Sequence, residues 1–241
     1  MPLDADAYRR TVRDEAATLV AAAERTGLDA PVPSCPDWDV AALLAHIGRV
    51  HRWAAGNIAA RELTSPAAIE QPPAGDALFD YARGGAVALS AELDRPADEP
   101  AWTFAPPPTV GFWQRRQAHE TTMHRVDAEL AGGDASPVDG DLAADGIDEW
   151  LHLLSYRPGK PAPTGQGETL HLHCTDRPGE WLLRLTPDGL EIEPTHAKGD
   201  VAVRGPASDL LLVLLHRASP GEVQVLGDGP AFDAFLAETA F

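Results

Sequence analysis

The first 156 residues carry apolar side chains at helical spacing. Between Leu3 and Ala23 the apolar positions recur every three or four residues, which predicts a helix over residues 4–26 that ends at Gly27. The same spacing predicts further helices over residues 39–61, 76–93, 111–131 and 142–155. Prolines interrupt the chain between several of them and exclude helix there. Four helices of this length form a bundle, whereas the fifth is expected to pack outside it or to lead away.

The pattern changes at residues 157–165, where proline and glycine predict a linker. Polar and apolar residues then alternate, which is typical of strands separated by turns. The expected strands cover residues 169–173, 181–185, 190–193, 200–203 and 223–226, with helices over 206–217 and 230–240. The sequence therefore predicts two domains, a helical bundle over 1–156 and a small α+β domain over 166–241.

The charge of the chain restricts its partners. A formal net charge of −18 argues against nucleic acid and against an anionic membrane surface. No apolar run is long enough to span a bilayer and no signal peptide is recognisable, so we expect a cytoplasmic protein. We therefore expect a small-molecule substrate, no nucleic-acid partner and no membrane partner, and the sequence does not indicate an oligomeric state.

The arginines are unevenly distributed along this acidic chain. Arg115, Arg116 and Arg125 lie in one predicted helix, and Arg49 and Arg52 lie in another. They are consistent with a locally basic pocket for a small anionic substrate. Pairing with surface carboxylates is an equally good interpretation.

Candidate metal ligands lie on two of the predicted helices. Glu120 and His124 are four residues apart and project from one face of the helix over 111–131. His46 lies on the inward face of the helix over 39–61 and would supply a third ligand. A carboxylate and two imidazoles leave coordination positions open, which is typical of a catalytic rather than a structural metal.

The spacing of this motif excludes a metalloprotease of the zincin type. His119 and His124 are five residues apart, so they point about 140° apart around the helix and cannot easily bind one ion. Glu120 is then a ligand and not a base. His119 is expected near the ligands without binding the metal, or on the surface. Asp127 either orients the imidazole of His124 or forms an exposed ion pair with an arginine.

Other residues with chemical potential have simpler interpretations. His171 and His173 share one face of a strand, but no third ligand accompanies them, so we place them on the sheet surface. Cys35 lies in a proline-flanked turn and is expected to serve packing. Trp38 and Trp53 are expected in the core, with pocket lining as the second interpretation.

Two segments, residues 32–49 and 119–129, together resemble the mycothiol-dependent maleylpyruvate isomerase family, a branch of the DinB-like putative metalloenzymes. Residues 203–217 and 225–228 resemble the second domain of that family. The resemblance implies a DinB-like four-helix bundle followed by a small sterol-carrier-like α+β domain.

The resemblance also implies an activity. It assigns a divalent metal, usually zinc, to His46, Glu120 and His124, with mycothiol as the thiol cosubstrate and Arg217 as a catalytic arginine of the second domain. The implied function is a metal- and mycothiol-dependent isomerase or S-transferase acting on a small anionic electrophile such as maleylpyruvate. The alternatives are a hydrolase of the same fold that uses metal-bound water, and a non-catalytic metal- or ligand-binding module.

Overall fold

The computed structural model describes residues 2–157 and 160–240, which divide into two compact units. The first unit is Pro2–Ser136 and the second begins at Pro137. Among the described residues, no helix combines the length and the apolar character that crossing a membrane requires.

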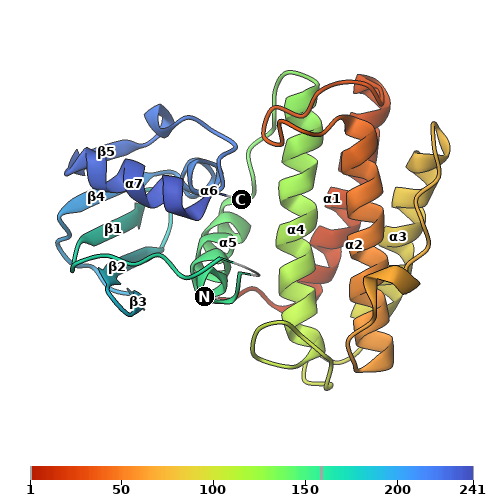
Figure 1. The fold of residues 1–241 in the computed structure, drawn as a ribbon, viewed down its shortest axis with the longest axis horizontal. Coiled ribbons are helices and arrows are strands. Elements are labelled where there is room, and N and C mark those ends of the chain that lie inside the picture. Colours follow the sequence, from red (N-terminus) through yellow and green to blue (C-terminus); the bar gives the residue numbers. More distant parts are fainter. Residues whose placement is uncertain (1, 158–159, 241) are drawn as a thin grey trace. The chain divides into compact units, whose positions relative to one another are not determined.

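The first unit is a four-helix bundle (Figure 1). Its helices are α1 (Ala5–Thr26), α2 (Val40–Ala60), α3 (Ala77–Leu93) and α4 (Val110–Ala131). Helix α1 packs along α4 and α2 along α3, while contacts between α1 and α3 and between α2 and α4 close the bundle. The described residues of this unit contain no sheet, only two isolated β-bridges. The helical fold expected for this part of the chain is confirmed.

Local sequence signals set the ends of these helices. Asp39 caps α2 because its carboxylate accepts a hydrogen bond of 2.8 Å from the backbone N–H of Ala42. Gly27 ends α1 with a φ of 92°, a conformation that glycine adopts without steric cost. Between the helices, Leu43, Leu44 and other apolar side chains are fully buried. The bundle thus fixes which faces of α2 and α4 meet.

Helices α2 and α3 approach closely at Gly85. A Cβ atom at this position would lie 2.8 Å from the backbone oxygen of Gly48 and 2.7 Å from the guanidinium of Arg52. We expect Gly85→Ala to lower the free energy of unfolding by roughly 1–3 kcal/mol, because the backbone of α2 would have to shift. Chemical denaturation measures this loss. Gly84→Ala is the matched control, since only the flexible tip of Arg52 is near it; a Gly85→Ala protein as stable as this control would contradict the expectation.

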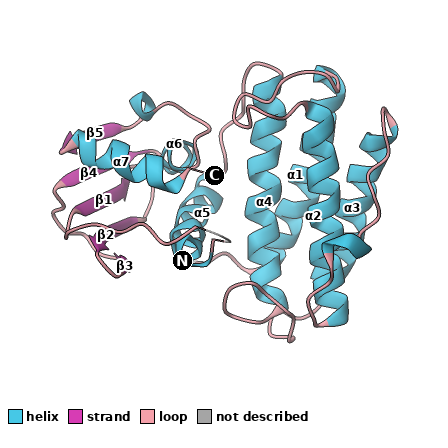
Figure 2. Cartoon of the chain, viewed as in Figure 1, coloured by secondary structure: helices cyan, strands magenta, loops and turns pink. Residues whose placement is uncertain are grey.

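The second unit combines a five-stranded mixed sheet with helices (Figure 2). Its elements are α5 (Gly140–Leu153), β1 (Thr169–Cys174), β2 (Glu180–Thr186), β3 (Gly189–Glu193), β4 (Val201–Gly205), α6 (Ala207–Leu214), β5 (Gln224–Gly227) and α7 (Gly229–Thr239). The strand order is β3-β2-β1-β4-β5, with β1 and β4 parallel and the other pairs antiparallel. Leu170, Leu172 and Val203 are fully buried within this unit.

Helix α5 belongs to the second unit. It packs against α6, the ring of Trp150 contacts that of Phe235 with centroids 6.0 Å apart, and the Trp181 indole donates a hydrogen bond to Asp148. The compact units therefore divide between Ser136 and Pro137, about 20 residues before the boundary at residue 156 that the helical pattern indicated. Part of the expected linker, residues 158–159, lies outside the described residues.

Candidate functional site

His46, Glu120 and His124 come together inside the bundle, and we call them the trio. Helix α2 supplies His46 and helix α4 supplies the other two. Glu120 Oε1 lies 3.5 Å from His46 Nε2 and 3.3 Å from His124 Nε2. One potential ligand atom from each residue lies within 4.8 Å of the others. The structure thus brings together the three side chains that the sequence offered as candidate ligands.

Asp127 fixes the orientation of His124. The carboxylate is fully buried and lies 2.8 Å from His124 Nδ1, one turn along α4. The hydroxyl of Ser34 donates a hydrogen bond of 2.5 Å to the other carboxylate oxygen. Because Nδ1 is held in this way, Nε2 faces Glu120. The alternative prediction, that Asp127 forms an exposed ion pair with an arginine, is therefore wrong. The sequence did not indicate the contact between Ser34 and Asp127.

Charged neighbours shift the pKa values of two residues of the trio. Burial would raise the pKa of Glu120, but hydrogen bonds from His124 and His46 and the charge of Arg116 hold it well below its usual value. Burial would lower the pKa of His124, yet the carboxylates of Asp127 and Glu120 raise it to about 9. In the absence of a metal, the protein therefore keeps a proton on His124 at neutral pH. Such a site favours a cation.

A pocket of about 500 Å³ opens beside His46. It is lined by Trp38, Ala42, Ala45, His46, Arg49, Val50, Trp53, Pro66, Ile69 and Pro72. The centroid of the Trp38 ring lies 4.8 Å from that of the His46 ring and 6.0 Å from that of the His124 ring. The indole therefore covers both imidazoles. Trp38 and Trp53 are only partly buried and line the pocket, which corrects the expectation that both belong to the core.

The arginines near the trio have different environments. Arg116 Nη2 donates a hydrogen bond of 2.9 Å to Glu120 Oε2, which leaves Oε1 directed at the two histidines. Arg49 is the one arginine among the residues that line the pocket. Of the arginines named from the sequence, Arg49 lines the pocket and Arg116 is bound to Glu120, so the basic pocket stays a prediction.

Two other arginines stabilise the bundle. The buried Arg125 donates hydrogen bonds to Glu15 of α1 (2.6 Å) and to Glu129 (2.7 Å). The guanidinium of Arg52 lies 3.8 Å from the centroid of the Tyr81 ring and donates to backbone oxygens of α2 and α3. The contacts of Arg125 and Arg52 therefore support a role in ion pairing and packing rather than in substrate binding.

The other histidines of α2 and α4 are not part of the trio and have other contacts. His119 is buried and its ring lies edge-on to Tyr8 of α1, with centroids 6.2 Å apart, so it is not a surface residue. His51 is fully buried, its Nε2 lies 3.0 Å from the Thr121 hydroxyl, and burial lowers its pKa to about 3. His51 is therefore neutral at physiological pH.

Arg217 lies just beyond α6 in the second unit. The helix ends at Leu214, three residues earlier than expected, because the left-handed conformation of His216 (φ 62°) reverses the chain. The backbone N–H of Arg217 then donates to Leu212 O at 2.7 Å, and its side chain donates to Leu215 O at 2.7 Å. The catalytic role of Arg217 stays a prediction.

Comparisons with known proteins agree with the two-part architecture. Residues 9–129 match the family model described as the mycothiol maleylpyruvate isomerase N-terminal domain, and residues 141–234 match the corresponding C-terminal domain. A crystal structure of the mycothiol-dependent maleylpyruvate isomerase superposes with a TM-score of 0.67 at 13% identity, covering 92% of this chain and 93% of that chain. A histidine-to-alanine variant of that enzyme gives a TM-score of 0.65 at the same identity and coverage. No curated protein sequence matches the chain. The chain belongs to the mycothiol-dependent maleylpyruvate isomerase family.

Proposed function

We propose that this enzyme is a metal- and mycothiol-dependent isomerase or thiol transferase that acts on a small anionic electrophile of the maleylpyruvate type. The observation that carries the proposal is the convergence of His46, Glu120 and His124 beside a pocket that Arg49 lines. Membership of the family supports the thiol and the class of reaction.

The residues of the trio fit a divalent metal. Two imidazoles and one carboxylate are a ligand set that zinc takes in catalytic sites, with further positions left to water or substrate. Asp127 and Glu120 together raise the pKa of His124 to about 9, so the site attracts positive charge before any metal binds. When bound, a divalent metal would stabilise a thiolate near neutral pH, where a free thiol with a pKa of about 8.5 is mostly protonated.

The protein's own groups would orient the reactants. Arg116 holds one oxygen of Glu120, and Asp127 holds Nδ1 of His124, so the remaining oxygen and nitrogen are directed at a common point. Trp38 covers the two imidazoles and restricts access of water from its side. Arg49 would bind a carboxylate of the substrate in the adjoining pocket.

The reaction itself needs no net redox change. A thiolate adds to the cis double bond of the substrate, and the electron pair moves onto the conjugated carbonyl as an enolate. Rotation about the new single bond follows, and the enolate then expels the thiolate to give the trans product. A cationic side chain such as Arg49, which lines the pocket, would stabilise the enolate charge.

Turnover that depends on mycothiol tests this function. The zinc-loaded protein is expected to isomerise a cis-configured conjugated keto acid only in the presence of the thiol. The change in ultraviolet absorbance of the conjugated double bond measures the reaction. Hydrolysis of an electrophilic substrate without thiol would instead favour a hydrolase that uses metal-bound water. Metal binding with no turnover across a broad set of electrophiles would favour a binding module.

Arg49→Ala tests the substrate-binding part of the proposal. We expect KM for the anionic substrate to rise about 10-fold or more while the zinc content stays unchanged, because a charge-assisted hydrogen bond contributes about 1.5–3 kcal/mol. Arg49→Lys should restore part of the affinity. The matched control is Arg61→Ala, since Arg61 pairs with Glu99 and is not among the residues that line the pocket. An unchanged KM in Arg49→Ala would exclude this role.

A further inference from the structure

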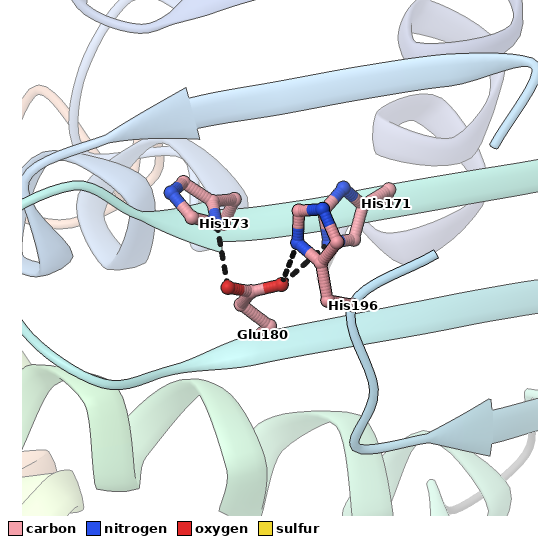
Figure 3. A group of neighbouring side chains, drawn as sticks. All are labelled: His171, His173, Glu180 and His196. Atoms are coloured by element: carbon pink, nitrogen blue, oxygen red, sulfur yellow. Dashed lines mark hydrogen bonds and ion pairs between the residues drawn. The ribbon is translucent and has the colours of Figure 1, made fainter. Parts of the chain in front are cut away.

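Four side chains of the second unit converge on the sheet, and we call them the sheet cluster: His171, His173, Glu180 and His196 (Figure 3). One potential ligand atom from each lies within 4.8 Å of the others. The expectation that His171 and His173 lack further ligands is therefore wrong. It failed because the two additional residues come from other segments of the chain.

The sheet itself brings three of the four residues together. His171 and His173 are two positions apart on β1, so their side chains project from the same face. In the antiparallel register of β1 and β2, Glu180 lies directly opposite His173 and shares that face. His196 comes from the loop between β3 and β4 and reaches the same point. Strand register thus presets most of the cluster, and a loop completes it.

The three imidazoles all face one carboxylate. Glu180 Oε2 lies 3.2 Å from His171 Nε2 and 2.5 Å from His196 Nδ1, while Oε1 lies 3.1 Å from His173 Nδ1. His173 Nδ1 is buried and has no well-directed hydrogen bond. Burial would raise the pKa of Glu180, but the hydrogen bond from His196 and the other histidines hold it below its usual value. The carboxylate is therefore ionised at neutral pH.

The four residues differ in exposure, so the candidate site has a buried side and an exposed side. The side chain of His171 is 8% exposed, whereas that of His196 is 78% exposed. In a tetrahedral zinc site with bonds of about 2.0–2.1 Å, donor atoms lie about 3.4 Å apart. The ligand atoms of the sheet cluster lie up to 4.8 Å apart, so the exposed side chain of His196 would have to move inward to bind the metal.

We propose that His171, His173, Glu180 and His196 bind a second divalent metal ion of the zinc type. Three imidazoles and one carboxylate suit zinc and neighbouring transition metals better than magnesium or calcium, which prefer oxygen ligands. Four protein ligands complete a tetrahedral shell, which is typical of a structural site. The metal would tie the loop over residues 194–200 to the sheet and has no part in the isomerisation.

Zinc binding to the full-length chain tests the proposal in a background in which the trio is disabled. Metal-free His46→Ala protein is titrated with zinc against a chromophoric chelator, and bound zinc is counted by elemental analysis. We expect one zinc ion per His46→Ala chain. The double variant His46→Ala/His196→Ala should bind it more than about 100-fold more weakly, since even residues that only support metal ligands contribute about 10–100-fold.

The matched control is His46→Ala/His152→Ala. His152 is an exposed histidine of α5 outside the sheet cluster, so its removal should leave the affinity unchanged. No zinc bound to His46→Ala protein would overturn the proposal, as would equal losses in the two double variants. If Glu120→Gln is used in place of His46→Ala, the second site should give the same result. Failure here would leave the proposed isomerase function untouched, because that function depends on the trio.

Proteolysis gives a second measurement that does not depend on counting metal. Lys198 is exposed in the loop that carries His196, so trypsin can cut after it. We expect zinc to slow cleavage at Lys198 in the wild-type protein and not in His196→Ala, with sites elsewhere serving as internal references. Equal protection of both proteins would contradict a metal that holds this loop through His196.

Discussion

Replacing His46 by alanine is expected to remove the metal from the trio and to lower turnover by about a thousandfold, because a catalytic metal contributes several kcal/mol to the transition state. His46 lies on α2 while the other two ligands lie on α4, and its side chain is partly exposed. The His46→Ala variant therefore keeps Glu120 and His124 in place, but its metal site lacks one of the three protein ligands. Turnover with saturating thiol and zinc measures the effect.

A matched control shows whether the loss of turnover is specific to His46 or follows from the removal of any histidine. His152→Ala removes an imidazole outside the trio and should retain full turnover. Thermal unfolding of both variants should resemble that of the wild-type protein in the absence of metal. Turnover in His46→Ala within a fewfold of wild type would show that the trio is not the catalytic centre.

Asp127→Asn is expected to weaken zinc binding at the trio by about 10–100-fold without changing the size of the side chain. The carboxylate of Asp127 accepts a hydrogen bond from the Nδ1–H group of His124. This contact favours the tautomer whose proton is on Nδ1, so the lone pair of Nε2 is free to bind the metal. An amide placed with its nitrogen toward Nδ1 would donate instead and would favour the opposite tautomer, with the proton on Nε2. Competition titration with a chelator in the His196→Ala background measures the affinity at the trio alone.

Ser34→Ala provides the comparison for Asp127. It removes the hydroxyl that donates to Asp127 but keeps the carboxylate and its contact with His124. Its effect on zinc affinity should be clearly smaller than that of Asp127→Asn. If Asp127→Asn binds zinc as tightly as the wild-type protein, then Asp127 does not control the tautomer of His124.

Local patterns in the sequence were sufficient to predict most of the elements. The helices of the bundle follow from apolar spacing, and their ends follow from features such as the Asp39 cap and Gly27. The assignment of α5 to the second unit could not be read locally, because it depends on contacts such as Trp150 with Phe235, which are 85 positions apart. Similarly, nothing in the helical spacing of α6 indicates that His216 reverses the chain.

The trio and the sheet cluster show the same contrast between contacts within one element and contacts between distant parts of the chain. Glu120 and His124 could be paired from sequence because one helix turn fixes their relation. Ser34 lies 93 positions from Asp127, so only the folded structure shows their contact. In the sheet cluster, strand register places Glu180 opposite His173, and a loop brings His196 to Glu180. Neither relation is set by the spacing of residues along one element.

Anomalous diffraction from crystals grown with zinc and mycothiol locates the metal directly. We expect a zinc peak about 2.0–2.1 Å from one atom each of His46, Glu120 and His124, with the thiol sulfur about 2.3 Å from the metal. A second peak at the sheet cluster would neither support nor contradict a metal at the trio. Crystals with bound mycothiol but no zinc peak among His46, Glu120 and His124 would contradict it.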